Sequence, residues 1–444
     1  MAAFDSGSRS YPRYATLAFS LALLGAASMV YYHLGLFIPR VIQVRASKGL
    51  GNGYTFGDDF YPIWLAARQW RAEHLNPYSA QMSREIQTGL FGRPLDPRNP
   101  ADPTADYRQF AYPAFTEILL WPSASLDFPK LRIVLAVVLP FLTAVSLWLW
   151  MLALQWHVHP LWFATLALLS LCNYQVLEAA FAGQPGLIVG FLLAGAALTL
   201  RRNRLLLAGT LMALTLVKPQ MSLLALAYLL VWSSSNRARA LFLAGFLGTT
   251  LCLMTASLWI WPHWIEQWLK VLWGYHRYAT PPLVTLLPGA SLGAYVGPVA
   301  IVAVLGLTAV LAWRTRHASV DSPDFWLTLS FLLAVTSITL LPGQAIYDDV
   351  ILFPGIFLIL RYRHDLYDMG RVSRILLSIG GVVLFWPWIA AFALILLRPW
   401  LPPATFNSTA VFSLPIRTAA SLPFAVVALL AYAKRINVGN RELA

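Results

Sequence analysis

The chain has 444 residues, of which 58% are hydrophobic and only 11% charged, and it carries 18 tryptophans. Soluble domains of similar length have about 25% charged residues, so this composition excludes an ordinary soluble protein and is typical of a polytopic membrane protein. The net charge of +13 does not indicate nucleic-acid binding, because the basic residues stand in short clusters between apolar runs rather than on one soluble face.

A series of apolar stretches follows along the chain, and several approach the roughly 20 residues that a membrane-spanning helix needs. The first contains small residues that resemble a signal-peptide cleavage site, but its apolar part is too long for one, so we expect a retained span. The stretches lie at about 13–38, 129–154, 160–177, 184–200, 204–233, 238–261, 293–313, 324–361, 373–397 and 418–435.

The basic clusters predict the topology, because Lys and Arg concentrate in cytoplasmic loops. With the clusters at 201–204 and 237–239 both inside, the run at 204–233 must be a hairpin, and its tip is predicted at Lys218, since Pro219 disfavours helix at the preceding residue. By the same parity, 324–361 is a hairpin with its tip at LPGQAIYDD (341–349). Both tips, and the long segment 39–128, are then expected on the outer face, where most of the acidic residues fall.

The long outer segment begins with two adjacent acids, Asp58 and Asp59. After them, apolar residues recur with the spacing of one helical face from Phe60 to Trp70, which predicts an amphipathic helix lying on the membrane. Either acid is a suitable N-cap for this helix, and Pro62 is tolerated in its first turn. A second short interfacial element is expected around 112–122.

These features together predict an all-α polytopic membrane protein of about twelve transmembrane helices, with interfacial helices in a long first outer loop. We divide it into an N-terminus with the first span, the outer loop, the core spans and the C-terminal spans. These regions cover residues 1–38, 39–128, 129–361 and 362–444.

Several short motifs follow one another along the chain. They are DFYPIWLAARQW (59–70) with NPYS (76–79), AYPAF (111–115), GQPG (183–186), RRNRLLLAGTLMALTLVKPQ (201–220) and the Tyr-Asp tip (347–349). In this order they resemble glycosyltransferase family 87, within the GT-C superfamily of integral membrane sugar transferases, and the resemblance runs from about residue 55 to residue 360.

The resemblance implies a GT-C fold and transfer of a sugar from a polyprenyl-phosphate carrier to a lipid or glycan acceptor outside the cytoplasmic leaflet. Similar proteins include mannosyltransferases of mycobacterial glycolipid assembly, so the expected sugar is a hexose such as mannose. It also implies a bacterial cytoplasmic membrane with the active site on the periplasmic face. The expected partners are the lipid-linked donor, the acceptor and membrane lipids, with no nucleic acid.

The resemblance also implies roles for individual residues. The family's first-loop acid falls on Asp59, although Ile63 replaces the tyrosine of the pattern, and its K-P lysine and G-Q glutamine fall on Lys218 and Gln184. Such a transfer needs a base for the acceptor hydroxyl and a cation for the departing phosphate, which a carboxylate and a lysine supply. Like-charge coupling with Asp58 would make Asp59 a stronger base. Direct displacement with one base inverts the anomeric configuration.

Each of these residues also has a purely structural explanation. Asp58 and Asp59 can serve as helix caps, and Lys218 can extend its charge from a helix end toward the membrane surface. A lysine at a sunken hairpin tip is costly, however, which favours contact with an anion such as the donor phosphate. Gln184 and Gln220 can bind the donor or hydrogen-bond the backbone.

The acceptor cleft has further candidates. Tyr347, Asp348 and Asp349 can line it or merely solvate a loop, and some relatives carry histidine near this tip instead. Tyr112 can contact the carrier or serve in packing. Arg68 can bind a ligand or lie on a solvated helix face.

We predict no metal and no cofactor, because no acid pair at helical spacing flanks a histidine and Lys218 supplies positive charge. The chain also lacks a Walker loop and a dinucleotide-binding glycine pattern, which agrees with a lipid-linked donor. One alternative is an enzyme of the O-antigen ligase or polymerase type, which would concentrate Arg and His in a late loop. Another is a transporter or flippase of lipid-linked sugars, which would show mid-span charges and a pseudo-repeat.

Overall fold

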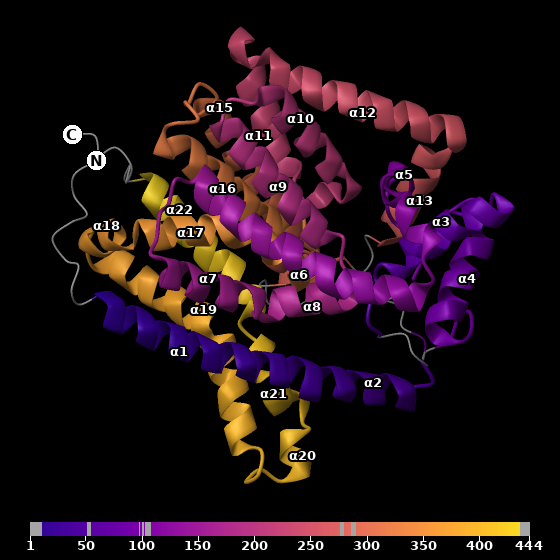
Figure 1. Ribbon diagram of the computed structural model, residues 1–444, viewed down its shortest axis with the longest axis horizontal. Helices are drawn as coiled ribbons and strands as arrows, with labels where there is room; N and C mark the ends of the chain where they lie inside the picture. The colour runs from indigo at the N-terminus through magenta and orange to yellow at the C-terminus, as the bar shows by residue number, and fades with distance from the viewer. Residues whose placement is uncertain are drawn as a thin grey trace.

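The structure is a computed structural model that describes residues 11–50, 55–96, 98–99, 102, 108–275, 279–285, 290–343 and 345–435. Every regular element in these residues is a helix, which confirms the predicted all-α class. The helices form one bundle, with a group of shorter helices at one end of it (Figure 1).

Long apolar helices confirm that the protein is built to cross a membrane several times. The first is nearly continuous from α1 (Tyr11–Val30) through a π-helix, η1 (Tyr31–Phe37), into α2 (Ile38–Ser47). The candidate spans among the described residues are six: Tyr14–Ser47, Phe128–Ala153 (α6), Arg237–Ile260 (with α12, Ala240–Ile260), Val296–Arg314 (within α15, Ala290–Arg314), Arg371–Leu397 (α19) and Leu414–Lys434 (with α22, Leu422–Arg435).

The other predicted spans are broken or short, so the count of about twelve stays a prediction. The stretch predicted at 160–177 is two helices bent by 56° relative to each other. These are α7 (Pro160–Leu171) and α8 (Tyr174–Ala182). The shorter apolar helices are α9 (Gly186–Arg201), α10 (Leu205–Leu214), α11 (Leu223–Ser234) and α16 (Pro323–Thr339).

Several loops with basic residues meet at one end of the bundle. Arg201 donates from Nε to the carbonyl of Ala153 at 2.9 Å and pairs with Asp321 at 3.1 Å. Arg239 donates to the carbonyl of Arg316 at 3.0 Å. Because α10 leaves this end and α11 returns to it, the turn between them lies at the opposite end, and the same holds for α16 and α17 (Phe353–Arg361).

That opposite end carries the shorter helices, which lie together at the right of Figure 1. They come mainly from the predicted outer loop, and α13 joins them from the segment after α12. They are α3 (Tyr61–Glu73), α4 (Ala80–Phe91), α5 (Phe115–Leu120), η2 (Trp121–Ser125) and α13 (Trp264–Tyr275). The remaining short α-helices are α14 (Pro282–Thr285), α18 (Arg363–Asp368), α20 (Pro403–Phe406) and α21 (Thr409–Phe412).

The start of α3 corrects one prediction. Its N-cap is Phe60 and no side chain caps it, so the expectation that Asp58 or Asp59 would serve there was wrong. The physical reason is that both carboxylates are held by an arginine from another segment, described below. Pro62 does lie in the first turn. The first half of α3 is buried against the neighbouring helices, and the Trp64 indole donates to the carbonyl of Leu126 at 2.9 Å.

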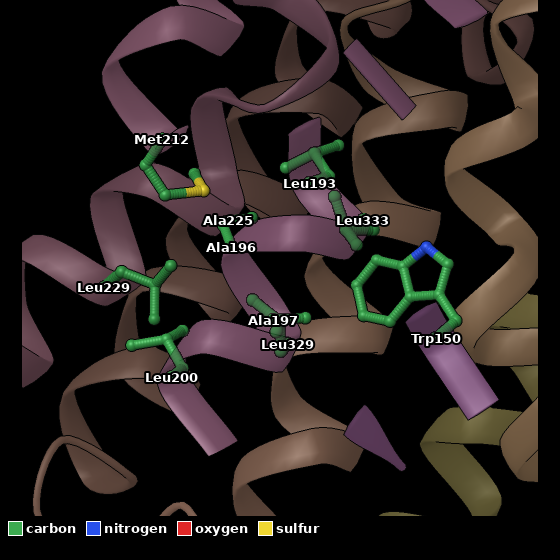
Figure 2. Close-up of a pocket in the computed structure, with 10 residues that line it drawn as sticks. All are labelled: Trp150, Leu193, Ala196, Ala197, Leu200, Met212, Ala225, Leu229, Leu329 and Leu333. Carbon is green, nitrogen blue, oxygen red and sulfur yellow. The ribbon is translucent and has the colours of Figure 1, made fainter. Parts of the chain in front are cut away.

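The middle of the bundle is closely packed. A gap of about 10 Å³ lies between α6, α9, α10, α11 and α16, and apolar side chains such as Trp150, Met212 and Leu333 line it (Figure 2). This volume is about that of one water, and an apolar gap of this size stays dry. This gap therefore offers no polar site for a substrate.

Candidate functional site

The site is built on a short backbone pairing between the segment at 57–59 and the end of α8. The Gly57 amide donates to the carbonyl of Phe181 at 2.7 Å, and the Asp59 amide donates to that of Ala182 at 2.9 Å. Gly183 follows with φ +70°, and a Cβ atom there would lie 3.0 Å from the Cα of Gly57. Since only glycine accepts both this conformation and this approach, the G-Q motif brings its glutamine beside Asp59.

Gln184 connects the predicted base to the predicted cation. Its side-chain amide Nε2 donates to Asp59 Oδ2, and its Oε1 accepts from Lys218 Nζ at 2.9 Å. The amide must be oriented this way, because an ionised carboxylate only accepts hydrogen bonds and an ammonium only donates them. Asp59 and Lys218, which come from distant parts of the sequence, therefore share one buried partner.

Lys218 lies at a break between two 3-10 turns, η3 (Thr215–Val217) and η4 (Pro219–Met221), with φ −136° and ψ 74°. Pro219 disfavours a helical conformation at the preceding residue, which is a local reason for this break. The turn is closed by a hydrogen bond of 2.8 Å between the hydroxyls of Thr215 and Ser222. The lysine is buried, and its ammonium lies 5.2 Å from the ring centroid of Tyr347.

The two acids of the later tip, in η6 (Ile346–Leu352), turn to different partners. Asp348 Oδ1 accepts from Lys218 Nζ at 2.6 Å, whereas Asp349 accepts from the hydroxyl of Ser337 in α16. Burial raises the pKa of both carboxyls, and the positive charge of Lys218 opposes this for Asp348. A Cβ atom at position 186 would lie 2.5 Å from Asp348 Oδ1, so the second glycine of GQPG leaves room for this contact.

Arg108 completes the site, and the sequence reasoning missed it. Its Nη2 donates to Asp58 Oδ2 at 3.1 Å, and its Nη1 donates to Asp59 Oδ1. The expected like-charge coupling between the two acids is therefore offset by a guanidinium that contacts both. Two adjacent acids indicate that a cation lies nearby, but no periodicity or motif in the sequence identifies Arg108 as that cation.

The loop that carries Arg108 is held by three hydrogen bonds to its backbone carbonyls. Gln87 donates to Arg108 O at 3.4 Å, Tyr78 donates to Tyr112 O at 2.7 Å, and the Trp268 indole donates to Ala111 O at 3.0 Å. These donors belong to α4, the turn before it and α13. The shorter helices at this end of the bundle thus serve to place the guanidinium.

Tyr112 and Tyr347 lie at the edge of this cluster. Burial raises the pKa of both phenols, and the negative charge of Asp348 adds to the effect for each. Arg108 acts electrostatically on both in the opposite sense. The two tyrosines therefore line the charged centre with polar, uncharged groups.

Two predicted residues are not brought into the network. Arg68 is 46% exposed and pairs with Asp127 at 3.3 Å, so it lies on a solvated face of α3. Gln220 is half-buried, and its side chain makes no hydrogen bond to the residues that the structure describes. Within the same residues, no group of three or more His, Cys, Asp or Glu side chains is placed to hold a metal ion.

The two acids, Asp58 and Asp59, differ in how far their side chains are exposed to solvent. The Asp58 side chain is 1% exposed and that of Asp59 is 12% exposed. A proton acceptor must reach a substrate, so geometry favours Asp59. The site thus offers one accessible carboxylate and, on the far side of a glutamine, one buried ammonium. That pairing suits removal of a proton at one point and stabilisation of a departing anion at the other.

Comparison with known families agrees with this chemistry. The family model described as glycosyltransferase family 87 matches residues 110–342, which is more than half of the chain. The chain belongs to glycosyltransferase family 87. It is a membrane glycosyltransferase, and the resemblance drawn from its motifs is confirmed. No curated protein and no solved structure matches it. The matched span contains Gln184 and Lys218, while Asp59, Arg108 and Asp348 lie outside it.

Proposed function

We propose that this family 87 enzyme transfers a sugar from a polyprenyl-phosphate donor to a lipid or glycan acceptor, with Asp59 as the base and Lys218 as the cation for the phosphate. One observation carries the proposal: the Gln184 amide bridges the two residues, with its Nε2 on Asp59 and its Oε1 2.9 Å from Lys218 Nζ. A base and a cation separated by a single side chain match the size of one glycosyl phosphate.

Lys218 has the hydrogen-bonding capacity for a phosphate. An ammonium carries three donors, and two of them are used by Gln184 and Asp348. The third is available to a phosphate oxygen, and the pair with Asp348 keeps the ammonium in place before the donor arrives. As the bond between the anomeric carbon and the phosphate oxygen breaks, negative charge develops on the phosphate, and a cation in a water-poor site stabilises it strongly.

Asp59 retains acceptor capacity for the second half of the reaction. An ionised carboxylate has about four acceptor positions, of which Arg108 and Gln184 occupy one each. A remaining lone pair on Asp59 takes the proton of the acceptor hydroxyl. The oxygen of that hydroxyl attacks the anomeric carbon at the same time. The reaction forms one glycosidic bond, releases polyprenyl phosphate and inverts the configuration at the anomeric carbon.

The remaining parts of the proposal concern the sugar and the side of the membrane. We propose a hexose such as mannose, from the family resemblance. The outer face of a bacterial cytoplasmic membrane is favoured because the loops with basic residues meet at the end of the bundle opposite the site. No step of this chemistry needs a metal, since Arg108 and Lys218 supply the positive charge.

The test is transfer of radiolabelled mannose from polyprenyl-phosphate mannose to extracted lipids by the purified protein in detergent. Asp59→Asn should reduce the rate by about 10² to 10⁴, the usual contribution of a positioned base. Asp127→Asn is the matched control, because that acid lies in the same outer segment but is 64% exposed and away from the network. Equal rates for the two variants, or movement of the donor across vesicles without transfer, would overturn the proposal.

A further inference from the structure

A polar cavity lies apart from the candidate active site, between the first long helix and the end of α19. It has a volume of about 320 Å³, within the range of small-molecule sites. Its wall includes Arg40 and Gln43 from α2, Arg398 from the end of α19, and Asn407 after α20. In Figure 1, α2 and the α20–α21 segment lie next to each other at the lower edge of the bundle.

The two arginines of this cavity carry charge without a carboxylate partner among the described residues. Arg40 Nη1 donates to the side-chain oxygen of Gln43 at 2.9 Å, and Arg398 Nη1 donates to the hydroxyl of Tyr31 at 3.2 Å. Each guanidinium has five N–H donors, so most remain available for a ligand. Guanidinium groups match phosphate in geometry and charge, which makes phosphate the favoured ligand.

The position of the arginines along their helices places this cavity at a membrane surface. Arg40 lies about 39 Å along the helix from Tyr14, and Arg398 lies about 40 Å from Arg371 at the start of α19. The hydrocarbon core is about 30 Å thick, so each helix reaches the headgroup layer where its arginine stands. Both arginines therefore come to the surface opposite the start of α19.

The cavity is also fixed by its surroundings. The Tyr32 hydroxyl donates to the carbonyl of Phe412 at 2.9 Å, and the rings of Phe37 and Phe412 stack with centroids 5.9 Å apart. These contacts tie α21 to η1, a π-helix, an irregularity that is frequent at functional sites. Leu36 and Phe406 add apolar surface to the wall beside the charged groups. A charged end beside an apolar wall suits a lipid better than a free ion.

We propose that Arg40 and Arg398 bind the phosphate of an anionic membrane lipid, whose glycerol and first acyl carbons lie against Leu36 and Phe406. The amides of Gln43 and Asn407 supply further hydrogen bonds to the headgroup. This site shares no residue with the proposed transfer site, so it stands or falls independently of the proposed function.

The test uses the full chain in nanodiscs that contain phosphatidylcholine and a photoactivatable phosphatidylglycerol, with mapping of the labelled peptides. We expect labelling at α2 and at α20–α21, and a loss of at least about tenfold there in the double variant Arg40→Gln, Arg398→Gln. Arg417→Gln is the matched control, because Arg417 is exposed as Arg398 is, lies near α21 and lines no part of the cavity. It should label as the wild type does.

Other results would overturn the proposal. Unchanged labelling in the double variant would show that the arginines do not hold the lipid, and equal labelling by a photoactivatable phosphatidylcholine would show apolar contact only. Displacement of the label by millimolar inorganic phosphate would assign the site to a free anion. If the double variant melts below the wild type, Arg398→Gln alone decides, because its side chain is exposed and its removal leaves the fold intact.

Discussion

The pair between Lys218 and Asp348 allows the phosphate role proposed for the lysine to be separated from its structural role. The two side chains are 9% and 1% exposed, and they meet at 2.6 Å. Asp348 Oδ2 has no hydrogen-bond partner among the described residues, so Lys218 is the group that satisfies this carboxylate. Removing the lysine alone therefore leaves a buried acid without its cation.

Breaking a buried ion pair by removing one partner costs about 3–5 kcal/mol, whereas replacing both partners by neutral groups of similar size is often close to neutral. We therefore expect Lys218→Met and Asp348→Asn each to lower the melting temperature by roughly 3 to 5 °C for a chain of this length. The double variant should recover most of that loss. Its sugar-transfer rate should remain about 10² to 10³ below the wild type, as expected when one group that stabilises the developing anion is lost.

The assay combines thermal unfolding in detergent with transfer from the radiolabelled polyprenyl-phosphate donor at saturating acceptor. Lys434→Met is a suitable control, since Lys434 also pairs with an acid, Asp324, but at the other end of the bundle. A double variant that folds and transfers sugar at the wild-type rate would refute a phosphate role for Lys218. A double variant no more stable than either single variant would refute the pairwise account of the site's stability.

Three further predictions concern the rest of the site and its surroundings. Gly183→Ala and Gly92→Ala both place alanine at a positive φ, which costs about 1 kcal/mol, but only position 183 also meets a neighbouring backbone; transfer should fall for the first and stay near wild type for the second. Burial raises the pKa of Glu117 well above its usual value, so the folded state binds a proton that the unfolded state loses. Stability should then fall as pH rises above about 4.5, by up to about 1.4 kcal/mol per pH unit, and melting curves of Glu117→Gln should lack this slope. Transfer should persist in excess EDTA, and its loss with restoration by Mg²⁺ or Mn²⁺ would contradict the prediction of metal independence.

Much of the local structure of the site could be predicted from neighbouring residues. The break at Lys218 is favoured by Pro219, whose ring disfavours helix at the residue before it. Gly183 and its φ of +70° follow from the usual way in which a helix ends. Such effects act within a few residues, so a single sequence contains them in full.

The partners of the charged groups could not be predicted in the same way. Asp58 and Asp59 were suitable N-caps for α3, and the local sequence contained nothing that favoured a distant guanidinium over the helix end. Tertiary contacts determine the partner of the two carboxylates, because Arg108 comes from a loop that Tyr78 and Trp268 hold in place. A charge-assisted hydrogen bond in a water-poor site is stronger than a cap at a partly hydrated helix end. The two carboxylates therefore bind Arg108 and do not cap α3.

The membrane spans were predicted less well where an apolar stretch of the sequence is not one continuous helix. The stretch at 160–177 is apolar throughout, but it bends by 56° between α7 and α8. Asn173 accepts from the Val176 amide at 2.7 Å and so starts a new helix in the middle of the stretch. A hydropathy pattern alone does not predict a helix N-cap inside an apolar stretch. The bend is nonetheless what directs the end of α8 toward Gly57 and the site.

The proposed function gives separate roles to the two adjacent acids, Asp58 and Asp59. Asp58 is buried and holds Arg108, and through it Arg108 is kept beside Asp59. Asp59 is the more exposed of the two and faces Gln184, so it alone reaches both the solvent-accessible side and the lysine network. If Asp58 were absent, the guanidinium would be free to pair with Asp59 through both of its oxygens and would compete with the acceptor hydroxyl. In the proposed mechanism the two carboxylates thus have different roles: Asp58 engages the arginine and Asp59 takes the proton.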